Sequence, residues 1–132
     1  MKIIIADTNL FISALLYQGK VSAKALLLAA DKYTLVLSDS IIDEIKDVVS
    51  RKEPRAIEIV DNFLSNFGYS LIQSKHLSIP DGFSIRDPKD EHVVTAAIAS
   101  ESDILLTRDK DFPKDGFPFE VLSPEEFLQK YS

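Results

Sequence analysis

The chain has 132 residues, 45% of them hydrophobic and 27% charged, so it can bury an ordinary core and is expected to form a single domain over residues 1–132. Its net charge of −6 argues against a protein that holds nucleic acid by bulk positive charge, and the lack of cysteine excludes disulfides and thiolate metal sites. No apolar run approaches the roughly 18 residues of a membrane span, and the N-terminus lacks the pattern of a signal peptide, so a cytoplasmic location is expected.

Short apolar runs alternate with amphipathic segments along the chain. The runs predict strands at residues 2–6, 33–37, 69–72, 103–107 and 119–123. The amphipathic segments predict helices at residues 10–17, 22–32, 38–50, 54–67, about 88–101 and 124–132, with a loop at 73–86. Alternation of this kind favours parallel βαβ units, and therefore an open α/β sheet with helices on both faces.

Two acidic residues follow predicted strands. Asp7 comes directly after the first strand, and Asp109 comes two residues after the strand at 103–107. If those strands are neighbours, the two carboxylates meet beyond the carboxyl ends of the sheet, where open α/β sheets form their sites. Each residue also has a structural explanation. Asp7 suits a helix N-cap, while Asp109 and Asp111 suit turns.

Two further acidic residues lie on predicted helices. Glu44 borders the buried stripe of the helix at 38–50, although an acid in that place is commonly just solvated. Ser38 and Ser40 are both possible caps of the same helix, and Ser40 with Asp43 resembles a capping box. Asp90 lies on the core-facing side of the helix that begins near residue 88.

The stretch RDPKDEH, residues 86–92, holds three carboxylates in five positions. Pro88 fits the first helical position, which makes Asp87 the N-cap and Asp90 the third residue of the helix. Asp90 could close a capping box from there, but it also faces the strand ends. Asp90 is therefore predicted as the functional acid and Asp87 as a cap. Glu91 would be the functional acid instead if the predicted register of the helix were wrong by one position.

Four carboxylates gathered in one place repel one another unless a cation offsets their charge. Oxygen ligands without cysteine or a histidine cluster favour Mg²⁺ or Mn²⁺ over zinc. Neither His76 nor His92 has a partner at metal-ligand spacing, so both are expected to be surface or loop residues. Such a cation suits phosphodiester hydrolysis because it activates a water and stabilises the leaving oxygen.

Four segments together resemble the PIN domain, the metal-dependent ribonuclease domain of VapC-type toxins. They are IIIADTNLFISALL, LSDSIIDEIKDVV, RDPKDEHVVTAAIAS and DILLTRDKDF. The resemblance implies a three-layer α/β fold whose central parallel sheet has four to five strands. It also implies a catalytic, metal-binding set of Asp7, Glu44, Asp90 and Asp109, supported by Asn9 and Thr107. Asp87 and Asp111 are further candidates for supporting residues.

The same resemblance implies an RNA substrate, a homodimer, and an antitoxin protein as partner. Two basic groups could form a local rim for RNA, although solvated faces are the commoner outcome: Lys46, Arg51, Lys52 and Arg55, and Arg108, Lys110 and Lys114. One alternative is a non-catalytic PIN-like module that binds RNA or protein. Another is a phosphotransferase with Asp7 as nucleophile, which the segment ADTN disfavours because it lacks a second Asp.

Overall fold

The computed structural model describes residues 1–83, 85 and 87–132. At its centre is a five-stranded sheet in the order β3-β2-β1-β4-β5, in which every pairing is parallel. The strands are β1 (Ile3–Ala6), β2 (Thr34–Ser38), β3 (Ser70–Ile72), β4 (Ile104–Leu106) and β5 (Glu120–Leu122). The parallel α/β sheet expected from the alternation of strands and helices is therefore confirmed.

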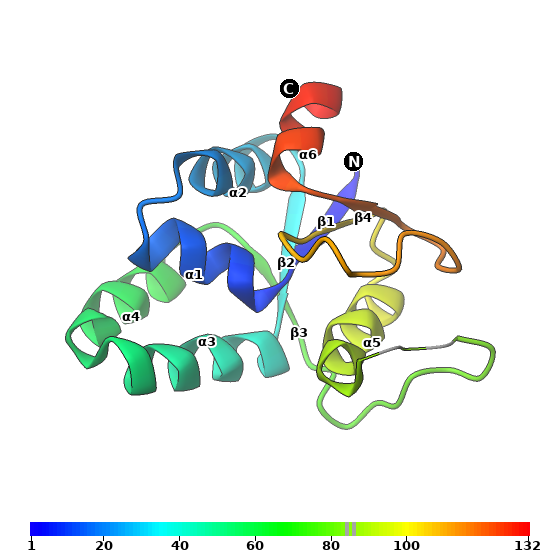
Figure 1. Ribbon diagram of the computed structural model, residues 1–132, viewed down its shortest axis with the longest axis horizontal. Helices are drawn as coiled ribbons and strands as arrows, with labels where there is room; N and C mark the ends of the chain where they lie inside the picture. Colours follow the sequence, from blue (N-terminus) through cyan, green and yellow to red (C-terminus); the bar gives the residue numbers. More distant parts are fainter. Residues whose placement is uncertain (84, 86) are drawn as a thin grey trace.

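Helices cover both faces of this sheet. They are α1 (Thr8–Leu16), α2 (Lys20–Lys32), α3 (Asp39–Lys52), α4 (Ile57–Asn66), α5 (Glu91–Ala99) and α6 (Pro124–Tyr131), with 3₁₀ turns η1 (Pro54–Ala56) and η2 (Pro88–Asp90). Figure 1 shows α1 to α4 on one side of the sheet and α5 on the other, which gives the predicted three layers. None of the helices in the described part of the chain has the length and apolar character needed to cross a membrane.

The central strands are hydrophobic along nearly their whole length because helices bury both of their faces. Ile4 and Ile5 of β1, Leu37 of β2 and Leu105 of β4 are fully buried. Phe11 of α1 is also fully buried. This apolar centre fixes the strands rigidly, so the residues at their carboxyl ends are held in defined positions.

Strand order places the ends of β1 and β4 side by side. Ala6 pairs with Leu106 at the end of the two strands. The backbone N–H of Asp7 donates to the carbonyl of Leu106 at 3.0 Å, which extends the pairing by one residue. The chain runs from β1 through β2 to β3 on one side, then crosses back to β4 on the other. The β1–β4 boundary is thus the point of reversal where a site is expected.

Some element boundaries differ from the sequence predictions. The cap of α3 is Ser38, whose hydroxyl accepts from the N–H of Ile41 at 3.0 Å, so the predicted capping box of Ser40 with Asp43 is wrong. The predicted helix at 54–67 is divided into η1 and α4. The described residues of the predicted loop at 73–86 form turns and irregular chain, and residues 84 and 86 lie outside the described part.

Candidate active site

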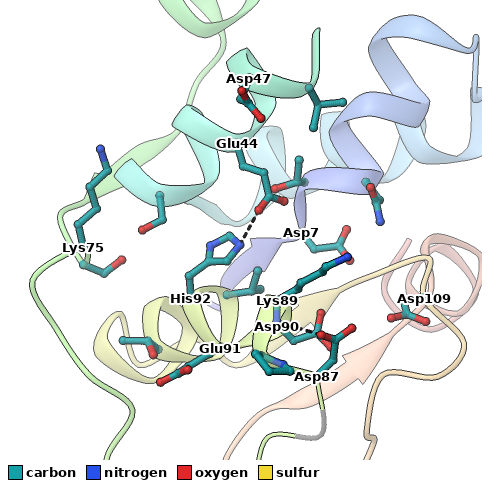
Figure 2. A pocket seen from close by; sticks show the side chains of 18 of the residues that line it. Asp7, Glu44, Asp47, Lys75, Asp87, Lys89, Asp90, Glu91, His92 and Asp109 are labelled. Carbon is teal, nitrogen blue, oxygen red and sulfur yellow. Dashed lines mark hydrogen bonds and ion pairs between the residues drawn. The ribbon is translucent and has the colours of Figure 1, made fainter. Parts of the chain in front are cut away.

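A pocket of about 750 Å³ lies beyond the carboxyl ends of β1 and β4. The four acids predicted as functional all line it: Asp7, Glu44, Asp90 and Asp109. In Figure 2, Asp7 lies between Glu44 on one side and Asp90 and Asp109 on the other. The lining also includes Thr8, Asn9, Asp47, Arg51, Lys75, Asp87, Lys89, Glu91 and His92. Acids that are distant in the sequence therefore share one space.

Asp7 is both the N-cap of α1 and a wall of the pocket. Its Oδ1 accepts from the N–H of Leu10 at 3.1 Å, and its Oδ2 accepts from the hydroxyl of Thr107. The side chain is almost completely buried, and burial raises its pKa to about 6 despite these two hydrogen bonds. The negative charges of Asp109 and Asp90 contribute to this raised value. The capping and site interpretations of Asp7 are thus compatible, because its oxygens face different partners.

Thr107 links Asp7 to Asp109. Its hydroxyl donates to Asp7 and accepts from the backbone N–H of Asp109 at 3.0 Å. The carboxylate of Asp109 accepts in turn from the N–H of Asp111 at 2.9 Å, which makes a turn. Asp111 therefore contacts the site through its backbone, and it does not line the pocket. Both interpretations of Asp109, as a turn residue and as an acid of the site, fit this geometry.

Asp87 and Asp90, which lie at the two ends of η2, differ in role, and Asp87 is the cap that the sequence predicted. Asp87 is the N-cap, and its Oδ1 accepts from the N–H of Lys89 at 3.0 Å. The half-buried side chain of Asp90 accepts no capping hydrogen bond, so it is not occupied as a cap. Burial raises the pKa of Asp90, and the charges of Asp87, Asp109 and Glu44 add to the effect. Asp90 is thus an acid held close to other acids.

His92 occupies a different place from the one predicted. It was expected to be a surface or loop residue, but it lies on α5 and its Nε2 is 2.9 Å from Oε2 of Glu44 (Figure 2). No spacing rule relates position 44 to position 92, because the two meet only through the packing of α3 against α5. The one sequence signal was the position of His92 two residues after Asp90. The loop residue His76 is exposed, as expected.

Asp39 at the start of α3 fixes the part of the pocket lining that is formed by Ser74 and Lys75. Its Oδ1 accepts from the N–H of Ser74 at 3.0 Å, and Oδ2 accepts from that of Lys75 at 3.4 Å. Lys75 also pairs with Asp43. Sequence reasoning did not single out Asp39, which acts as a structural anchor for a loop that lines the pocket.

One arginine from each of the two predicted basic groups pairs with an acid. Arg51 pairs with Asp47 at 3.1 Å, both largely exposed. Arg108 pairs with Glu125 at 3.2 Å and donates to Ser22 at 2.6 Å. Each arginine is paired with an acid, but Arg51 also lines the pocket, so the choice between a local rim for RNA and a solvated face stays a prediction.

The donor set matches the chemistry of a hard divalent cation. Its members are carboxylates, and the charges of neighbouring acids help to raise the pKa values of Asp7 and Asp90, a repulsion that a cation would relieve. In the described part of the chain, two buried side-chain atoms lack a hydrogen-bond partner, Thr8 Oγ1 and His92 Nδ1, and both residues line this pocket. Within the same part, no three ligating side chains stand close enough to form a ready-made metal site. The acids would therefore have to draw together around an ion.

Comparison with known proteins gives two likenesses. The family model of the PIN domain matches residues 3–111. A chain in the crystal structure of VapBC2 from Rickettsia felis, bound to a DNA fragment from their promoter, is 20% identical to this chain. The match covers 92% of this chain and 98% of that one with a TM-score of 0.65, which shows a shared fold. No curated protein sequence gives a significant match.

Proposed function

Because this chain belongs to the PIN domain family, we propose that it is a metal-dependent endoribonuclease that hydrolyses RNA phosphodiester bonds. PIN domains are generally nucleases. The observation that carries the proposal is the shared pocket of Asp7, Glu44, Asp90 and Asp109, which come from four separate segments of the chain. Clustered carboxylates weaken a fold by mutual repulsion, so a protein without metal chemistry gains nothing from them.

In this proposal, Asp7, Asp90 and Asp109 bind Mg²⁺ or Mn²⁺, and Glu44 completes the set. The cation supplies charge neutralisation at the phosphate and activates the attacking water. Thr107 and the N–H of Leu10 fix the carboxylate of Asp7 before any ligand arrives. Asp7 is thus preorganised and need not rearrange when the other acids draw together around an ion.

The remaining supporting residues have smaller roles. Asn9 lines the pocket beside Asp7 and presents an amide to bound RNA or water. Asp87 shapes the first turn before α5, and Asp111 holds Asp109 in its turn through a backbone N–H. These contacts orient the acids and do not require direct contact with the cation.

We further propose that the protein is the toxin of a toxin–antitoxin system, acting as a homodimer that a cognate antitoxin blocks. The support is the resemblance of the four sequence segments to VapC-type toxins, together with the fold shared with a chain of VapBC2. A small neighbouring gene whose product binds this chain and stops RNA cleavage would test the assignment.

A non-catalytic PIN-like module that binds RNA or protein is the second candidate. Two observations favour it: the net charge of −6, and the lack of a ready-made metal group in the part of the chain that the structure describes. Metal titration separates the two candidates. A nuclease of the proposed kind melts at a higher temperature with Mn²⁺, whereas a pure binding module does not respond.

The decisive experiment is cleavage of end-labelled single-stranded RNA with Mg²⁺ or Mn²⁺. We expect cleavage that EDTA abolishes and that Asp7→Asn lowers by at least about 100-fold, given the role assigned to Asp7. Asp43→Asn, purified in parallel, is the control for contaminating nuclease, because Asp43 lies on the same helix as Glu44 but outside the pocket. Cleavage that survives both EDTA and Asp7→Asn would exclude this mechanism.

A further inference from the structure

The pair Glu44–His92 joins α3 to α5 across the pocket. Its atoms, Oε2 of Glu44 and Nε2 of His92, lie 2.9 Å apart. Among the described residues, this is the one side-chain hydrogen bond between those two helices. The Glu44 side chain is 43% exposed and that of His92 is 26% exposed, so the bond lies at the mouth of the pocket and not in the core.

Glu44 is held differently from the acids at the strand ends. Asp7 and Asp109 each accept a hydrogen bond from a backbone N–H within their own turn, which fixes them locally. Glu44 has a longer side chain with more rotamers, and in the described structure its carboxylate has no partner other than His92. The direction of the Glu44 carboxylate therefore depends on a residue from another helix.

The direction of the hydrogen bond follows from the chemistry of the two groups. An ionised carboxylate only accepts, so the hydrogen lies on Nε2 of His92. The other ring nitrogen, Nδ1, is buried and has no protein partner. A bare nitrogen is less costly to bury than an unpaired N–H, which favours the tautomer that donates to Glu44.

We propose that His92 is a positioning residue that holds the carboxylate of Glu44 toward the other acids of the pocket. The inference rests on the proposed function, because it assigns His92 a task within that same site. Residues behind a ligand commonly change metal affinity or activity by about 10- to 100-fold when they are removed. His92 acts through Glu44, so its contribution should vanish once Glu44 no longer offers a carboxylate.

The test is a double-mutant cycle with a conservative rescue. His92→Phe keeps a ring but removes the donor, whereas His92→Gln places an amide N–H near the position of Nε2. Glu44→Gln and the double variant Glu44→Gln/His92→Phe complete the cycle. His76→Phe is the matched control, since His76 is the other histidine of the chain and lies outside the pocket. Each variant is assayed for kcat and KM on single-stranded RNA and for the rise in melting temperature with Mn²⁺.

We expect His92→Phe to lower kcat about 10-fold or more and to shrink the Mn²⁺-induced rise in melting temperature. His92→Gln should recover most of both, and the double variant should match Glu44→Gln. Equal losses from His92→Phe in the wild-type and Glu44→Gln backgrounds would overturn the inference, as would no loss at all. If the wild type fails to cleave RNA, the proposed function fails. The Mn²⁺ readout then decides the inference alone: a Glu44-dependent loss supports it, and no response to Mn²⁺ overturns it.

Discussion

The hydroxyl of Thr107 donates a hydrogen bond to the carboxylate of Asp7, although the two residues lie 100 positions apart in the chain. The contact exists because β1 and β4 are neighbours and end at the same level of the sheet. Thr107 also accepts from the N–H of Asp109, so one hydroxyl connects the two acids that follow the strands. The geometry of the candidate site is thus tied directly to strand pairing.

Thr107→Val should both destabilise the protein and reduce its activity. Valine has the same shape, but it leaves the buried carboxylate of Asp7 and the N–H of Asp109 without their partner, which costs about 1–3 kcal/mol. Urea denaturation measures the loss, and RNA cleavage should fall at least about 10-fold because the carboxylate of Asp7 loses its orientation. Thr107→Ser retains the hydroxyl and should stay near wild type. A valine variant with wild-type stability would show that the hydroxyl of Thr107 contributes little to the free energy of unfolding.

Asp7 should make the metal-free protein less stable as pH rises. Its pKa in the folded state is about 6, above its ordinary value of 3.8, so the folded state binds more protons than the unfolded state between these values. Stability contributed by this group is therefore complete below pH 3.8 and is lost as pH rises through 6. Linkage predicts that the protein is about 1 kcal/mol less stable at pH 7 than at pH 5 through Asp7 alone.

Asp7→Asn isolates this contribution, because asparagine keeps an acceptor for the N–H of Leu10 but cannot ionise. Urea denaturation in EDTA at pH 5 and pH 7 gives the difference for the variant and for the wild type. We expect the variant to gain about 1 kcal/mol relative to the wild type between the two pH values. Parallel pH profiles of the two proteins would refute the raised pKa of Asp7.

Mn²⁺ or Mg²⁺ should stabilise the wild type, since an ion that binds only the folded state adds about 2.7 kcal/mol at 100 times its Kd. Glu44→Gln should reduce this gain because it removes one of the pocket carboxylates. Asp43→Asn is the matched control on the same helix, because Asp43 itself does not line the pocket. Melting temperatures with and without the ion measure the effect. Equal losses in the two variants would mean that the ion binds elsewhere.

Asp90→Asn should abolish RNA cleavage with little loss of stability, whereas Asp87→Asn should be mild. Asp90 accepts no capping hydrogen bond, so the fold does not depend on its charge. Asp87 caps η2, and asparagine caps as well as aspartate does. Cleavage rates and thermal unfolding of the two variants provide the comparison. The opposite ranking would identify Asp87, and not Asp90, as the acid that acts on RNA.

Local sequence patterns were sufficient to predict the elements and several residues of the site. Apolar runs predicted the five strands, and the central strands β1, β2 and β4 need hydrophobic side chains throughout because both of their faces are covered, whereas the edge strand β3 is largely exposed. Asp87 was correctly predicted as a cap from Pro88 beside it, since capping depends on neighbours in the chain. The sequence left both Ser38 and Ser40 open as caps of α3, because both residues suit that role, and the structure has Ser38 as the cap.

The sequence by itself determined which residue types stand at the strand ends and helix starts, because hydrophobic burial and capping act over a few neighbouring positions. Only the tertiary structure decided that Thr107 contacts Asp7, that Asp39 anchors the loop at Ser74, and that His92 meets Glu44. These partners come from different elements, and the sheet order and the packing of α3 against α5 bring them together. The periodicity of a sequence does not predict contacts between distant elements. His92 was therefore predicted to be a surface or loop residue, although it lies in the candidate site.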